Sequence, residues 1–128
     1  MTYRWVEHTS ELELEVEAES EEGVFGDAVA AFAELLADGG DGRIAHELPL
    51  RSADRPGRLV ELLEELVFLA DTSGFVPERL EEIDLAAGRA RVAGHDGSPP
   101  PLVKGVTYHG LELGPHAGGW RARVVLDV

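Results

Sequence analysis

The chain has 128 residues, and its 25 aspartates and glutamates against 11 lysines and arginines give a formal net charge of −14. A chain of this length builds one domain with its own core, while a negative field of this strength repels phosphates and argues against stable direct binding of RNA or DNA. The absence of cysteine excludes disulfides, thiolate metal sites and a cysteine nucleophile.

The sequence has no apolar signal-peptide core near its N-terminus and no apolar run approaching the roughly 20 residues that cross a bilayer. The most apolar segment, residues 59–70, is interrupted by three glutamates. We therefore expect no membrane association and a cytoplasmic location.

Residues 11–19 alternate strictly between glutamate and an apolar residue. A period of two predicts a half-buried strand, with five glutamates in water and the other positions facing the core. The core-facing positions are Leu12, Leu14, Val16 and Ala18. Because glutamates on one face repel one another, this strand needs basic neighbours or a cation beside it.

Two amphipathic helices are expected. The first has Ser20 as its N-cap, apolar residues at helical spacing over 24–36, and a stop at Gly39 and Gly40. The second has Asp54 as its N-cap, Pro56 in its first turn and a stop at Gly74. Its apolar stripe comprises Leu59, Leu62, Leu63, Leu66, Leu69 and Ala70, widened by Val60, Val67 and Phe68.

The remaining segments predict strands. A weakly patterned strand is expected at 45–51, a hairpin at 80–85 and 90–93, and two final strands at 104–113 and 120–126, with a proline-rich loop at 95–101. The order of the elements predicts an α+β fold in which residues 1–128 form a single domain, with a mostly antiparallel or mixed β-sheet and two amphipathic helices packed on it.

Generic catalytic motifs are absent, since the sequence contains no phosphate-binding loop, dinucleotide fingerprint or His-Glu-x-x-His pattern. Carboxylates remain, and hard divalent cations take oxygen ligands from several chain segments. Glu11 and Asp127 would meet if the first and last strands pair. The alternative is that Glu11 belongs to a solvated acidic face and Asp127 to a frayed terminus.

Three ordered segments of the chain resemble the archease family. They are residues 8–11 (His-Thr-Ser-Glu), the leucine-rich helix 59–69 followed by 71–75, and residues 104–111 together with the chain end 119–128. The blocks Lys-x-Val-Thr-Tyr-His and Val-Leu-Asp-Val are the most specific parts, and the resemblance spans nearly the whole chain.

The resemblance implies a function that cannot be inferred from composition alone. Archeases are small accessory proteins of the RtcB-type RNA ligase used in tRNA splicing and RNA repair. They promote guanylylation of the ligase with GTP, allow multiple turnover, and are linked to a bound divalent metal. The resemblance thus implies an activator that is not itself an enzyme. Its partner would be an RtcB-type ligase that uses GTP, and its cofactor calcium, or manganese or magnesium.

Carried over position by position, the metal ligands of the family correspond to Glu11, Asp127 and Val128, the last through main-chain or terminal oxygens. Lys104 matches a basic family position that could contact the ligase or a nucleotide phosphate. The family usually has aspartate at the position of Glu11 and glycine at that of Glu13. The extra methylene of Glu11 moves its oxygens by more than about an ångström, so metal affinity or selectivity differs or the metal site is lost.

Two other function classes stay open. A metal-dependent phosphoester hydrolase would use Glu11 and Asp127, but it needs a further base that the sequence does not identify. A non-catalytic protein-binding module would use the acidic surface to meet a basic protein.

Overall fold

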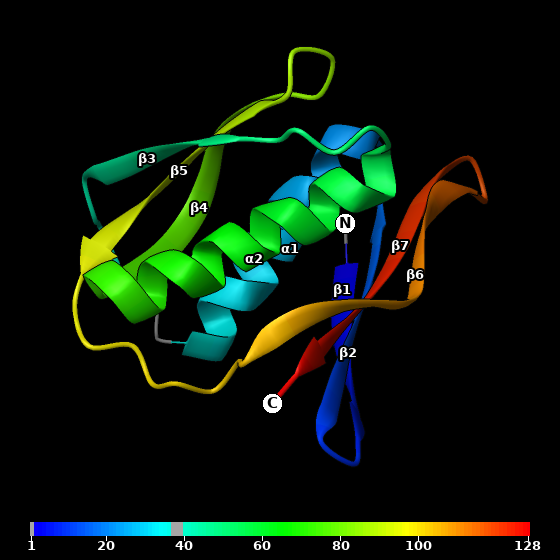
Figure 1. Cartoon of the computed structure of the whole chain (residues 1–128). Coiled ribbons are helices and arrows are strands. Elements are labelled where there is room, and N and C mark those ends of the chain that lie inside the picture. The colour runs from blue at the N-terminus through cyan, green and yellow to red at the C-terminus, as the bar shows by residue number, and fades with distance from the viewer. Residues whose placement is uncertain (1, 37–39) are drawn as a thin grey trace.

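The computed structural model describes residues 2–36 and 40–128, and this part of the chain contains seven strands and two helices (Figure 1). In chain order they are β1 (Thr2–His8), β2 (Glu11–Ala18), α1 (Glu21–Leu36), β3 (Ile44–Pro49), α2 (Arg55–Ser73), β4 (Phe75–Asp84), β5 (Arg89–Asp96), β6 (Gly105–His116) and β7 (Gly119–Asp127). Neither of the helices described is long and apolar enough to cross a membrane.

The strands form two antiparallel sheets, one in the order β1-β2-β7-β6 and one in the order β3-β5-β4. The helices lie between the sheets (Figure 1): α1 packs on β4 and β2, and α2 packs on β6 and β4. The predicted α+β domain with two helices and antiparallel strands is confirmed, but the strands are divided between two sheets.

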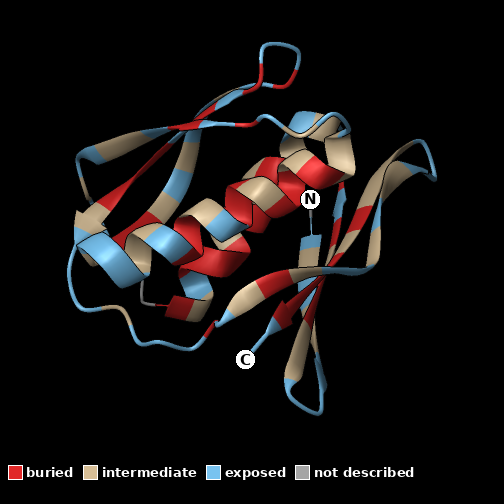
Figure 2. Ribbon diagram, viewed as in Figure 1, coloured by how far each residue is buried: buried red, intermediate tan, exposed pale blue. Residues whose placement is uncertain are grey.

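The core is supplied by the helices and by the inner faces of both sheets. Figure 2 shows buried positions concentrated along the two helices. The largest fully buried side chains include Phe25, Phe32, Leu59, Leu62, Leu63 and Leu66 from the helices, and Leu14, Phe75 and Leu126 from the strands. The prediction that Phe68 belongs to the apolar stripe of α2 is wrong, because this side chain is 58% exposed.

Both helices begin at the predicted caps. The Ser20 hydroxyl accepts a hydrogen bond from the Gly23 N–H at 3.0 Å, and the Asp54 carboxylate accepts one from the Gly57 N–H at 2.7 Å. Gly74 ends α2 in the left-handed region, at φ 68°, as expected of a glycine after a helix. The predicted stop of α1 at Gly39 and Gly40 cannot be compared directly, because residues 37–39 lie outside the described part of the chain.

Strand β1 is absent from the sequence-based prediction. It pairs with β2 from Thr2↔Glu17 to His8↔Glu11, so that only Thr9 and Ser10 form the connection. Two-residue hairpin loops are usually signalled by Asn-Gly, Asp-Gly or Gly-Gly. Here Ser10 adopts the left-handed conformation instead, at φ 62°, and the usual signal is missing.

Strands β4 and β5 are longer than predicted. The expected hairpin turn is observed, with Gly88 at φ 79°, but β4 already begins at Phe75 and includes Pro77, while β5 continues through His95 to Asp96. Proline is tolerated because β4 is an edge strand and its pairing with β5 shifts between Pro77 and Arg79. The observed loop therefore starts at Gly97, two residues later than predicted.

A buried carboxylate joins this sheet to the loop before β3. The Glu78 side chain is 4% exposed, and its two oxygens each accept from the Gly42 N–H at 3.0 Å, while His95 Nδ1 lies 2.6 Å from Oε2. The hydrogen bond from His95 lowers the pKa of Glu78, burial opposes this shift, and Gly42 and Arg79 add to the lowering.

This environment predicts an acid-dependent loss of stability. Because the pKa of Glu78 is lower in the folded than in the unfolded chain, its stabilising contribution is complete above the unfolded pKa, about 4.3. It declines as the pH falls from there through the folded pKa. In urea unfolding at several pH values, Glu78→Gln should be less stable than the wild type at neutral pH, and the difference should shrink as the solution is acidified. A constant difference between pH 7 and pH 3 would contradict this assignment.

Candidate functional site

The pairing of β2 with β7 places Glu11 directly opposite Asp127. The strand pairing on which this site hypothesis depends is therefore present. Asp127 is also opposite Gly105 of β6, and its carbonyl accepts a hydrogen bond from the Lys104 N–H at 2.8 Å. The Val128 N–H in turn donates to the Ser10 carbonyl at 3.3 Å. The structure thus gathers all four sequence-predicted site residues at one end of the four-stranded sheet.

The hairpin between β1 and β2 forms part of the same end. Ser10 adopts a backbone conformation that costs free energy for a residue with a side chain, and such residues cluster at functional sites. Its carbonyl is the acceptor for Val128, so the hairpin turn and the chain end are held together.

A surface hollow of about 260 Å³ lies beside these residues. Glu11 and Val128 line it, together with the polar neighbours Glu7 and His8. Its apolar wall consists of Leu12, Leu35 and Leu102. The candidate site therefore combines carboxylates with an apolar hollow that is open to a partner.

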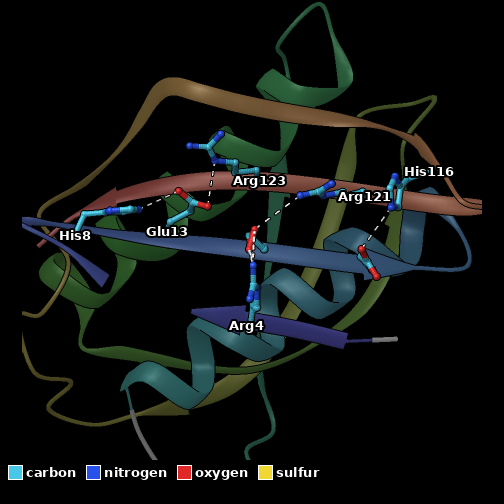
Figure 3. A network of polar contacts seen from close by, with 8 residues as sticks. Arg4, His8, Glu13, His116, Arg121 and Arg123 are labelled. Carbon is cyan, nitrogen blue, oxygen red and sulfur yellow. Dashed lines mark hydrogen bonds and ion pairs between the residues drawn. The ribbon is translucent and has the colours of Figure 1, made fainter. Parts of the chain in front are cut away.

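The outer face of the four-stranded sheet carries an ion-pair network (Figure 3). Arg4 Nε donates to Glu15 Oε1 at 2.7 Å, and Arg121 lies 3.9 Å from the other oxygen of Glu15. His116 faces Glu17 at 3.7 Å. The basic neighbours that the alternating strand was predicted to need are therefore present, and they come from β1, β6 and β7.

Glu13 is the buried member of this network. It is only 7% exposed, so its prediction as a solvated residue is wrong. His8 Nε2 lies 3.2 Å from Oε1, and Arg123 Nε lies 3.2 Å from Oε2, a close ion pair without hydrogen-bond geometry (Figure 3). Arg123 is opposite Glu15 in the register and reaches Glu13 diagonally. One sequence feature could have predicted these ion pairs: Arg121 and Arg123 repeat at the same two-residue spacing as the glutamates of β2.

The oxygen donors fit a hard divalent cation in part. Glu11 and Asp127 offer carboxylates from paired strands, and Val128 offers main-chain oxygens, which are the ligand types that calcium, magnesium and manganese prefer. Within residues 2–36 and 40–128, no group of three or more His, Cys, Asp or Glu side chains is arranged to hold a metal. The remaining coordination positions would fall to water or to a partner, and metal binding by these residues stays a prediction.

Lys104 is the only lysine in the chain, which otherwise uses arginine for its fixed positive charges. Its main chain is tied to Asp127, while its side chain is exposed. Beyond it, β6 pairs irregularly between Thr107 and Glu112, around Gly110 at φ 69°. A flexible ammonium group at this end of the sheet can contact a phosphate or an acidic partner residue.

The burial of Glu13 makes Arg123 important for stability. Arg123→Ala should lower the free energy of unfolding by about 1–3 kcal/mol, because it leaves a buried carboxylate without its charge partner. In a Glu13→Gln background, Arg123→Ala should lower the free energy of unfolding by a smaller amount. The control Arg89→Ala removes an exposed pair with Asp84 at 3.8 Å and should cost less than about 1 kcal/mol. Equal losses for Arg123→Ala in both backgrounds, measured by urea unfolding, would refute the coupling.

Known proteins resemble this chain along nearly its whole length. Residues 3–128 match the family described as Archease protein family (MTH1598/TM1083). Protein archease of Methanosarcina mazei is 34% identical over 139 residues, which cover 98% of this chain and 95% of that protein. Probable protein archease of Mycobacterium tuberculosis is 32% identical over 136 residues, which cover 98% of this chain and 74% of that protein.

Two solved structures share the fold. The solution structure of Methanobacterium thermoautotrophicum protein 1598 superposes with a TM-score of 0.75 at 24% identity and covers 98% of each chain. The crystal structure of a Thermotoga maritima protein, described as an archease and possible chaperone, has a TM-score of 0.72 at 18% identity and covers 100% of this chain and 98% of its own. The fold and the family match agree, and the chain belongs to the archease family.

Proposed function

We propose that this chain activates an RtcB-type RNA ligase of tRNA splicing and RNA repair by promoting its guanylylation with GTP and its multiple turnover. Membership of the archease family, generally composed of non-catalytic accessory proteins, supports this proposal. The observation that carries it is the position of Glu11 opposite Asp127 at an exposed end of the sheet, beside Lys104.

In this proposal the chain contributes charge and position, and the ligase contributes the nucleophile. Glu11, Asp127 and Val128 would hold a divalent cation, which when bound neutralises phosphate charge during phosphoryl transfer. The Lys104 ammonium would contact a nucleotide phosphate or the ligase. Arg123 and Glu13 would keep β2 and β7 in register, so that the carboxylates stay opposite each other.

The alternatives receive different support. A protein-binding or chaperone role agrees with the description of the Thermotoga maritima protein as a possible chaperone. A hydrolase would need a base in addition to the two carboxylates. His8 lines the same hollow as Glu11, but its Nε2 already faces Glu13 at 3.2 Å. We therefore favour the ligase activator.

The first test measures guanylylation of the cognate ligase with GTP. Equimolar wild-type protein should raise the guanylylated fraction under turnover conditions, and Asp127→Ala should remove most of this stimulation because it removes one of the two opposed carboxylates. Glu17→Ala is the matched control, since Glu17 is an exposed carboxylate at the far end of β2. The proposal fails if the wild-type protein leaves guanylylation unchanged.

Metal binding is a separate prediction with a readout independent of the ligase. Calorimetric titration of the isolated protein with calcium or manganese should detect one site. Glu11→Ala and Asp127→Ala should each weaken it by at least about tenfold, a loss seen even for outer partners of metal sites. Glu17→Ala should bind like the wild type, and Glu11→Asp should retain the site with altered affinity. Identical titrations for the wild type and both alanine variants would exclude this ligand set.

A further inference from the structure

The side of α2 that faces away from the core carries an exposed aromatic residue among carboxylates. Phe68 is 58% exposed, whereas Leu59, Leu62, Leu63 and Leu66 of the same helix are fully buried. One turn before and after it, at helical spacings of three and four residues, lie Glu64, Glu65, Asp71 and Thr72. We call Glu64, Glu65, Phe68 and Asp71 the α2 outer surface; a single exposed phenylalanine is ordinary, and what distinguishes this one is the carboxylates around it.

The carboxylates of the α2 outer surface have no ion-pair partner among the residues that the structure describes. No ion pair within residues 2–36 and 40–128 involves Glu64, Glu65 or Asp71. Glu61, one turn earlier, differs because its oxygens accept from the N–H groups of Arg51 and Ser52 at 2.8 and 2.9 Å. Three negative charges therefore surround Phe68 without partners in the described structure.

One of these charges also opposes the helix dipole. α1 follows the favourable order, with Glu21 and Glu22 in its first turn. In α2, Asp71 stands in the last turn, where carbonyl groups already give negative potential and a cation would be stabilising. Stability therefore does not explain Asp71, and residues that break such a local rule are often functional.

The α2 outer surface is joined to the candidate site along the chain. After α2 ends, the Gly74 carbonyl accepts from the Gly97 N–H at 2.8 Å, which starts the segment leading to β6. Figure 1 shows this segment running from the C-terminal end of α2 toward the chain end. It carries Leu102, 44% exposed, which lines the hollow shared with Glu11 and Val128.

We propose that the α2 outer surface docks on the ligase itself, with Phe68 in an apolar pocket rimmed by lysines and arginines; this rests on the proposed function. An enzyme that binds RNA and GTP must present positive charge near its active site. Unpaired carboxylates on a chain with a net charge of −14 complement such a surface and steer association. A buried aromatic anchor with a polar rim is the arrangement that supplies most binding energy at protein interfaces.

The test separates docking from chemistry by titrating the cognate ligase with wild type, Phe68→Ala and Asp71→Lys. Each variant should weaken binding by at least about tenfold, as expected for a central anchor and for a reversed charge beside it. The protein concentration for half-maximal guanylylation should rise by the same factor, with the maximum reached again at saturation. Asp127→Ala should instead lower the maximum and leave the affinity largely unchanged.

Glu22→Lys is the matched control, because it makes the same change of charge at an exposed residue of α1. Its neighbour Glu21 contacts Arg55, which lies at the opposite end of α2 from Asp71. This control should leave ligase affinity unchanged. The melting temperatures should move in opposite directions, up for Asp71→Lys and down for Glu22→Lys, since one substitution complements a helix dipole and the other opposes it. Weaker binding by a variant with a higher melting temperature cannot be a consequence of unfolding.

The outcomes are distinct. Stimulation by the wild type together with equal ligase affinity for the wild type, Phe68→Ala and Asp71→Lys would overturn the docking inference and leave the proposed function intact. Neither binding nor stimulation by the wild type would overturn both. If sedimentation shows a wild-type dimer that Phe68→Ala dissociates, while ligase affinity stays the same, a second copy occupies this surface and the docking inference is wrong.

Discussion

The antiparallel pairing of β2 with β7 is the contact on which the rest of the structure depends. It joins the beginning and the end of the chain, and its inner face contributes Leu14, Val16, Val124 and Leu126 to the core. A slip of one residue would turn these side chains out of the core and the glutamates into it. The diagonal pairs of Arg121 with Glu15 and of Arg123 with Glu13 provide a second constraint on the same register. Burial on one face and charge on the other thus specify where Glu11 meets Asp127.

Much of this arrangement could be predicted because short sequence motifs determine it. The helix caps at Ser20 and Asp54 and the glycine after α2 need only a few neighbouring residues to be recognised. The alternation over 11–19 predicts a strand and a side that faces the core. The meeting of Glu11 with Asp127 required one further assumption, that the first predicted strand pairs with the last, and the structure contains that pairing.

Other features depend on contacts that no local pattern encodes. The division of the strands into two sheets depends on how the sheets cover the helices on both sides. Strand β1 was missed because its turn to β2 has serine, and not glycine or asparagine, in the left-handed conformation. Glu13 has the same sequence context as Glu15 and Glu17, yet it alone is buried, since His8 and Arg123 converge on it from neighbouring strands. Phe68 is a different case: it lies about two and a half turns beyond Leu59, so helical spacing alone places it on the far side of α2, and its prediction as part of the apolar stripe overlooked this. The resemblance to archeases implies glycine at the position of Glu13, and its two partners provide a local physical reason for a charged residue there.

The hydrogen bond from Val128 to the Ser10 carbonyl has a consequence for the order of assembly. The candidate site joins Ser10 and Glu11 to Asp127 and Val128, so it forms only when β7 is available to pair with β2. Contacts of such large sequence separation raise the contact order and slow folding. Until β7 arrives, β2 has an open edge of unpaired backbone groups, and its row of glutamates is a natural safeguard against pairing with another nascent chain. The glutamates that pair with arginines in the folded sheet would thus protect the unfinished chain.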